Sequence, residues 1–126
     1  MSDEPLECAL AFERGDRDGD PFGHRDHVEL AWAFHRALPF DEAAPRTARA
    51  LRRFAAARGA PASYHATLTW AFLSLVAERL EAPGARALSF DRFAADNRDL
   101  FDKELVARRY GLRLDDPAAR RTFLLP

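Results

Sequence analysis

Apolar residues recur at helical spacing along most of this chain, and prolines and glycines divide that pattern into segments. Spacings of three and four residues bring side chains to one face of an α-helix, whereas a half-buried strand requires strict alternation. The apolar stripe of the segment 24–38, for example, consists of Val28, Ala31, Trp32, Phe34 and Leu38. No alternating run is long enough to indicate a strand. The sequence therefore predicts an all-α fold.

Proline and glycine also mark where the expected helices begin and end. Gly15 to Gly23 reads as a loop, and Pro83 with Gly84 ends a long helical pattern. Ser63 is a candidate N-cap for the helix that precedes Pro83. Three long helices are expected over about 24–38, 41–58 (or from 45) and 64–82, with shorter ones near 5–13, 89–97, 99–108 and 117–123. We expect a compact bundle of three long helices with shorter N- and C-terminal helices.

The 126 residues match the usual size of one domain, so we expect a single helical domain over 1–126. Cys8 is the only cysteine, which excludes an internal disulfide, and we expect it to be a small core residue. The acidic start Met-Ser-Asp-Glu-Pro differs from a signal peptide, which indicates the cytoplasm. No stretch approaches the roughly 20 apolar residues of a membrane span, so no membrane insertion is expected.

The charge of the chain gives little support to a nucleic-acid role. The formal net charge is −1, so no overall field attracts nucleic acid or anionic lipid. The second long helix does contain a group of arginines: Arg46, Arg49, Arg52, Arg53 and Arg58. We expect them to form one solvated face rather than an anion site. Phe54 is the one aromatic residue among them, too few for a nucleic-acid surface.

The histidines suggest a metal site. His24 and His27 lie in Phe22-Gly-His24-Arg-Asp-His27, and His65 lies in Ser63-Tyr64-His65-Ala-Thr67-Leu-Thr69. Short connections make neighbouring long helices antiparallel, so the first and third run in the same direction and both motifs should lie at one end of the bundle. Neutral imidazole is the commonest ligand for transition metals. We therefore predict a divalent zinc, iron, copper or nickel ion on His24, His27 and His65.

Residues near the three histidines extend this hypothesis. Three protein ligands with an open position are typical of a catalytic metal site, and Tyr64 and Thr69 are candidate catalytic hydroxyls. Apolar walls from Phe22, Trp32, Trp70 and Phe72 would suit a small organic substrate. His35 lies eleven residues beyond His24, about 16 Å along a helix, and belongs to another layer.

Two alternatives to metal-dependent catalysis remain open. In the first, an enzyme without a metal uses His27 or His65 as a general base and Tyr64 as an acid. In the second, the chain is a non-catalytic helical binding module, for example a homodimer, whose aromatic residues, 11% of the chain, provide interface anchors.

The two histidine motifs, Phe22 to His27 and Tyr64 to Thr69, resemble those of a group of small, uncharacterised bacterial helical proteins. That group has Phe- or Trp-x-His-x-x-His, then Tyr-His-Glu-Thr-Leu-Thr some forty residues later, and a closing stretch similar to residues 110–126 of this chain. Ala66 stands where the group usually has Glu. If that carboxylate is a ligand or a base in the group, its loss either alters the chemistry here or leaves the role to Asp26, Glu29 or water. The resemblance implies a site but no particular reaction.

Overall fold

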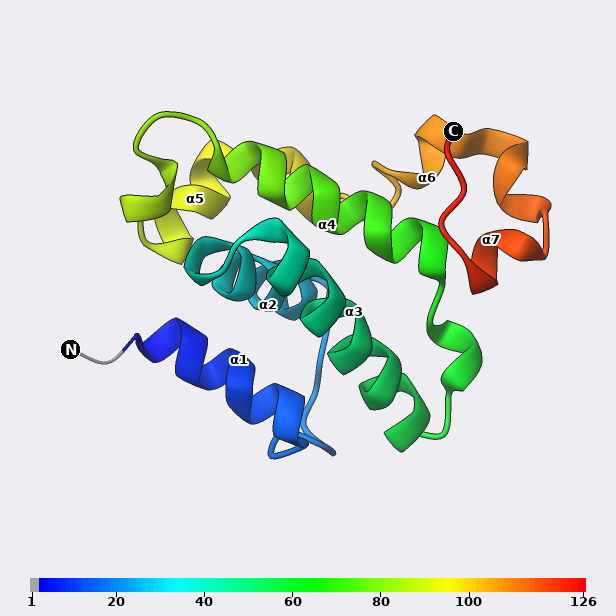
Figure 1. Ribbon diagram of the computed structural model, residues 1–126, viewed down its shortest axis with the longest axis horizontal. Helices are drawn as coiled ribbons and strands as arrows, with labels where there is room; N and C mark the ends of the chain where they lie inside the picture. Colours follow the sequence, from blue (N-terminus) through cyan, green and yellow to red (C-terminus); the bar gives the residue numbers. More distant parts are fainter. Residues whose placement is uncertain (1–2) are drawn as a thin grey trace.

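The computed structural model describes residues 3–126, and within them it is all-α, which confirms the predicted fold class (Figure 1). Short 3₁₀ turns join several of the helices. None of the described helices has both the length and the apolar character needed to cross a membrane. The helices are α1 (Glu4–Arg14), α2 (His24–Ala37), α3 (Phe40–Ala57), α4 (Ala66–Leu80), α5 (Phe90–Asp96), α6 (Ala107–Tyr110) and α7 (Ala118–Arg121).

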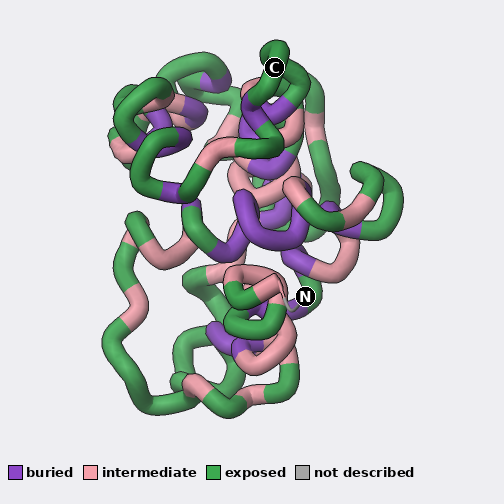
Figure 2. The backbone as a smooth tube through the Cα atoms, turned by 90° about the vertical axis from the view of Figure 1, so that its left-hand side faces the viewer, coloured by how far each residue is buried: buried purple, intermediate pink, exposed green. Residues whose placement is uncertain are grey.

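Helix α2 is the central element, since it packs against α1, α3 and α4. Its predicted apolar stripe is buried, with Val28, Trp32 and Phe34 almost completely inaccessible to solvent. Figure 2 shows the buried positions gathered in the middle of the molecule and the exposed ones on its outer turns. The hydrophobic effect of this stripe therefore determines how the other helices are arranged around α2.

Helices α2 and α4 run in the same direction, as predicted, but they are staggered. The ring of His24, the first residue of α2, lies 5.6 Å from the ring of Phe72 in the second turn of α4. At the opposite end, Arg86, which follows α4, donates to the carbonyl oxygen of His35 near the end of α2. Since Phe72 lies seven residues after His65, the start of α4 extends about 10 Å beyond His24 along the axis.

The start of α4 differs from the prediction that Ser63 is its N-cap. Ser63 instead ends a 3₁₀ turn that begins at Pro61, and its hydroxyl donates to the carbonyl oxygen of Ala60 at 2.8 Å. The chain stays extended through Tyr64, and His65 is the N-cap, with its Nδ1 accepting from the backbone N–H of Leu68 at 3.2 Å. The prediction was wrong because Pro61 starts a separate turn before the helix.

The C-terminal tail is fastened to the first turns of α4 (Figure 1). The buried hydroxyl of Thr67 donates to the carbonyl oxygen of Thr122 at 2.8 Å and accepts from the backbone N–H of Leu124 at 3.1 Å. Arg120 donates to the carbonyl oxygen of Ala62 at 2.6 Å. Thr67 is therefore a structural residue that joins two segments far apart in the sequence.

The helix expected over 99–108 is only partly formed. The structure has a 3₁₀ turn at Arg98–Phe101 and then the short helix α6, separated by turns. Asp102 stabilises this break, because its carboxylate accepts from the backbone N–H of Glu104 at 2.9 Å and pairs with Arg108. An Asp side chain that binds nearby backbone N–H groups favours a turn over a continuous helix.

Candidate functional site

A cleft between the start of α2, the second half of α3 and the first turns of α4 brings together four of the five predicted site residues. It consists of two adjoining cavities of about 190 and 500 Å³, and His27, Leu51 and Thr69 line both. His24, Asp102 and Lys103 line the smaller cavity, and Phe22, Arg58 and Tyr64 line the larger. We call this region, with the residues named here, the histidine cleft.

The two histidines of α2 hold their ring protons in opposite positions. Nε2 of His24 lies 2.8 Å from the carbonyl oxygen of Leu100, and Nδ1 of His27 lies 3.1 Å from that of Gly23. Because a carbonyl oxygen only accepts, each of these ring nitrogens must donate a proton. In the neutral rings, Nδ1 of His24 and Nε2 of His27 therefore have a free lone pair. Neither of these two atoms has a hydrogen-bond partner among the described residues, and both side chains are only partly buried.

The environment keeps His27 neutral and Tyr64 protonated. Burial lowers the pKa of His27, a nearby positive charge on His24 would lower it further, and the bond to Gly23 only partly opposes this effect. Burial raises the pKa of Tyr64, against the opposing effects of Arg52 and of the side chains of Trp70 and Thr69. Near neutral pH the cleft thus holds both an unprotonated imidazole nitrogen and a phenol that retains its proton.

His65 does not line the histidine cleft. Its Nδ1 is used to cap α4, and the stagger of α4 relative to α2 places it beyond the level of His24. Burial and the charge of Arg120 both lower the pKa of His65. The two histidine motifs lie at the same end of the bundle, as predicted. The offset of α4 relative to α2 along the helix axis, however, depends on packing that the sequence does not reveal.

Within residues 3–126, no three His, Cys, Asp or Glu side chains are arranged so that they could hold a metal ion. The ring centres of His24 and His27 lie 6.4 Å apart. Two imidazoles on one tetrahedral ion would have centres about 5 Å apart, given a metal–nitrogen distance of about 2.1 Å. The carboxylate of Asp102, which also lines the cleft, is already bound to Arg108 and Glu104. The structure brings His24 and His27 together without His65, and the predicted metal ion on the three histidines stays a prediction.

The cleft also contains residues that the sequence did not suggest. Asp102 and Lys103 come from the turn before α6, where a helix was expected, and Leu51 and Arg58 come from α3 and its C-cap. Leu51 and Arg58 had only the apolar and basic periodicity of α3 as a sequence signal, and this periodicity does not indicate which helix lies opposite. Asp102 and Lys103 had no sequence signal. Ala66 is not in the cleft, although it occupies the position where the resembling group has Glu.

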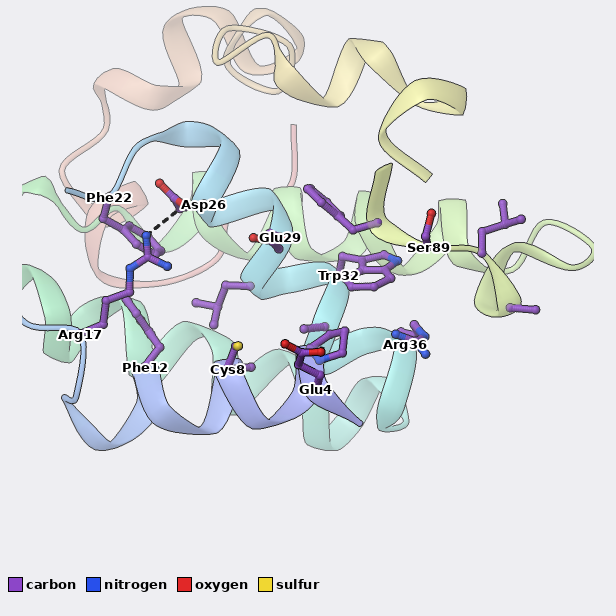
Figure 3. A pocket seen from close by; sticks show the side chains of 17 residues that line it. Glu4, Cys8, Phe12, Arg17, Phe22, Asp26, Glu29, Trp32, Arg36 and Ser89 are labelled. Atoms are coloured by element: carbon purple, nitrogen blue, oxygen red, sulfur yellow. Dashed lines mark hydrogen bonds and ion pairs between the residues drawn. The ribbon is translucent and has the colours of Figure 1, made fainter. Parts of the chain in front are cut away.

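A separate pocket of about 600 Å³ lies between α1, α2 and the segment 87–90 (Figure 3). Arg17 and Asp26 are paired at 3.2 Å at one end of this pocket, and Trp32 lines it rather than the histidine cleft. Cys8 is exposed at this pocket, which corrects the expectation of a core position. Cys8 lies on the part of α1 that lines this pocket, and the buried residues of the helix are Ala9 and Phe12 instead.

The fold and the cleft together define a small all-α protein with a two-histidine cleft at one end of a helical bundle. Comparison of the chain with protein-family models, with curated proteins and with solved structures finds no match. The function must therefore be argued from the residues of the cleft.

Proposed function

We propose that the chain is an enzyme that transfers protons on a small organic substrate in the histidine cleft, with His27 as the general base. The observation that carries this proposal is the hydrogen bond from Nδ1 of His27 to Gly23, which leaves Nε2 unprotonated on a residue that lines both cavities of the cleft. A base held in one tautomer by a backbone carbonyl is preorganised for proton abstraction.

Tyr64 is the matching acid, because it lines the same cavity as His27 and its raised pKa keeps the phenol protonated at neutral pH. A base and a neutral acid on one cavity suit the removal of a proton from a carbon next to a carbonyl group. The proton moves to Nε2 of His27 while the electron pair of the C–H bond moves to the carbonyl oxygen. Tyr64 donates its hydrogen bond to that oxygen, and the reverse step returns a proton to carbon.

The walls of the cleft favour a small, mainly apolar substrate. Leu51, Phe54 and Phe22 line the larger cavity, and Phe72 lines the smaller one. Its volumes of about 190 and 500 Å³ suit metabolite-sized molecules. Apolar walls exclude water around the substrate, which strengthens the hydrogen bond from Tyr64 to the developing oxyanion.

Hydrogen–deuterium exchange on carbon tests this proposal with a panel of candidate substrates. A mixture of small ketones and oxo acids is incubated with the protein in D2O, and loss of individual C–H signals is followed by proton NMR. The parent protein is expected to accelerate exchange in at least one member. The His27→Ala variant is expected to slow it by about 10²- to 10⁴-fold, the usual contribution of a positioned base.

The His65→Ala variant is the matched control, because it removes an imidazole outside the cleft and costs only helix-cap stability, about 1 kcal/mol. Exchange that survives in folded His27→Ala protein would reject His27 as the base. The absence of exchange in every member of the mixture would reject this reaction.

A metal-assisted version is the second candidate, favoured by one specific observation. Both His24 and His27 donate their ring N–H to a backbone carbonyl, an arrangement common among histidines that bind metals. A divalent ion on His24 and His27 would polarise the carbonyl oxygen of the substrate. Titration with zinc, followed by the histidine ring signals, is expected to move both rings together if this version holds. Movement of neither ring would reject it.

A further inference from the structure

A second groove, next to the histidine cleft, combines three arginines with three aromatic side chains. It has a volume of about 1020 Å³ and lies between α3, the turn before α4, α4 itself and the C-terminal tail. No Asp or Glu occurs among the described residues that line it. We call it the arginine groove, and its characteristic residues are Arg52, Tyr64, Trp70, Arg120, Arg121 and Phe123.

The three positive charges of the arginine groove are not neutralised by carboxylates. Arg120 and Arg121 donate only to backbone carbonyl oxygens, those of Ala62 and Pro117, and Arg52 forms no side-chain hydrogen bond or ion pair within residues 3–126. A chain with a net charge of −1 thus concentrates unpaired positive charge in one concave place.

Other arginines of α3 have different partners. Arg46 pairs with Glu13 at 2.7 Å and Arg53 with Asp18 at 3.1 Å, so both fasten α3 to the N-terminal part of the chain. The sequence-based expectation of one solvated basic face therefore holds for Arg49, Arg52 and Arg58, which are exposed, but not for Arg46 and Arg53. Two of its arginines form ion pairs between segments, and Arg52 faces the groove.

Tyr64 connects the two sites, because it lines both the arginine groove and the larger cavity of the histidine cleft. A molecule held by the guanidinium groups can thus extend past the phenol toward His27. The charge of Arg52 acts on the phenol, since it lowers the pKa of Tyr64 against the larger effect of burial. The groove and the cleft are therefore neighbours that share Tyr64 as a lining residue.

We propose that the arginine groove binds the anionic end of the substrate, an organic phosphate or carboxylate attached to a planar group. Guanidinium groups bind both oxyanions with paired hydrogen bonds, and Trp70 and Phe123 provide surfaces for a planar body. The assignment of this anion to a substrate rests on the function proposed for the cleft. Anion binding in the groove is tested independently.

The test uses phenyl phosphate as the probe and the indole N–H signals of the ¹⁵N-labelled full chain as the readout. The chain has two tryptophans, and only Trp70 lines the groove, whereas Trp32 lines the pocket beside α1. Phenyl phosphate is expected to shift the Trp70 signal and leave the Trp32 signal in place. Benzoate is expected to bind at the same site, and phenol, which lacks the charge, much more weakly.

The Arg52→Gln variant is expected to weaken phenyl phosphate binding about tenfold, because a charge-assisted hydrogen bond contributes on this scale. Arg49→Gln is the matched control, since Arg49 is exposed on the same helix but does not line the groove. Arg52→Gln should also raise the pKa of Tyr64, measured from its ultraviolet absorbance, whereas Arg49→Gln should leave it unchanged.

Equal effects of the two substitutions, equal binding of phenol, or no binding of phenyl phosphate would overturn the proposal. Binding of a short single-stranded oligonucleotide with much higher affinity and the same dependence on Arg52 would replace the small anion with nucleic acid. The two proposals fail separately. Phenyl phosphate binding without catalysed C–H exchange would reject only the function of the cleft. Exchange of an oxo acid that is unaffected by Arg52→Gln would reject only the assignment of the bound anion to the substrate.

Discussion

Lowering the pH from 7 to 5 is expected to destabilise the protein, and His35→Leu is expected to remove a large part of this effect. His35 is buried in α2, where its Nδ1 donates to the carbonyl oxygen of Ala31 at 2.8 Å and its Nε2 has no partner within the described residues. Burial, reinforced by the positive charge of Arg86, lowers the pKa of His35. His35 therefore binds a proton less readily in the folded protein than in the unfolded chain.

The sign of the effect follows from the two protonation equilibria. An unfolded histidine has a pKa of about 6.5, so below that pH the unfolded chain binds more protons than the folded one. The free energy of unfolding then falls as the pH falls, by at most about 1.4 kcal/mol per pH unit for each histidine, until the folded pKa is reached. His27 and His65 also have lowered pKa values, so a smaller dependence should persist without His35.

Urea unfolding of the parent and of His35→Leu at pH 7 and pH 5 measures this dependence. Leucine fills much of the same volume and removes the buried Nε2, so the variant should lose less stability between the two pH values. The His65→Ala variant is a useful comparison, because His65 is half-buried and contributes less. Equal losses in the parent and in His35→Leu would show that His35 does not control the acid response.

The second large effect is expected from Thr67→Val, which should lower the free energy of unfolding by about 1–3 kcal/mol. Valine has nearly the shape of threonine but no hydroxyl group. It therefore leaves the carbonyl oxygen of Thr122 and the N–H of Leu124 without their partner at α4. Hydrogen exchange at the amide of Leu124 should become much faster, because the tail opens while the bundle remains folded.

Thr67→Ser and Thr69→Val are the controls for this prediction. Serine keeps the hydroxyl oxygen and should preserve the protection of the Leu124 amide. Thr69 lies in the histidine cleft, and the hydrogen bonds to the tail come from Thr67 instead, so Thr69→Val should change stability little. If Thr67→Val and Thr69→Val behave alike, the hydroxyl of Thr67 does not hold the tail.

Much of the fold could be predicted because helical periodicity and breaking residues are local signals. The stripe containing Trp32 and Phe34 predicted the buried face of α2, and Pro83 with Gly84 lie just beyond the end of α4 as expected. The start of α4 and the break after Phe101 were not predicted. They depend on competition between side chain–backbone hydrogen bonds and helix formation, which His65 and Asp102 decide.

The candidate site was predicted in part for a similar reason. His24 and His27 are three residues apart on one helix, so their proximity follows from local geometry. The position of His65 depends on the stagger of α4 against α2, which arises from packing between distant segments. The arginine groove was missed because Arg52 meets Arg120 and Arg121 only after the tail folds back onto α4.

The protonation of the imidazole rings decides whether the histidine cleft holds a general base. Two-bond proton–nitrogen correlation spectra of the ¹⁵N-labelled protein at pH 7 identify the tautomer of each ring, with His24→Ala and His27→Ala used for assignment. The structure predicts a proton on Nε2 of His24 and on Nδ1 of His27, and a neutral His27 whose pKa lies below that of a free histidine. A charged His27 at pH 7, or one with its proton on Nε2, would contradict its assignment as the general base.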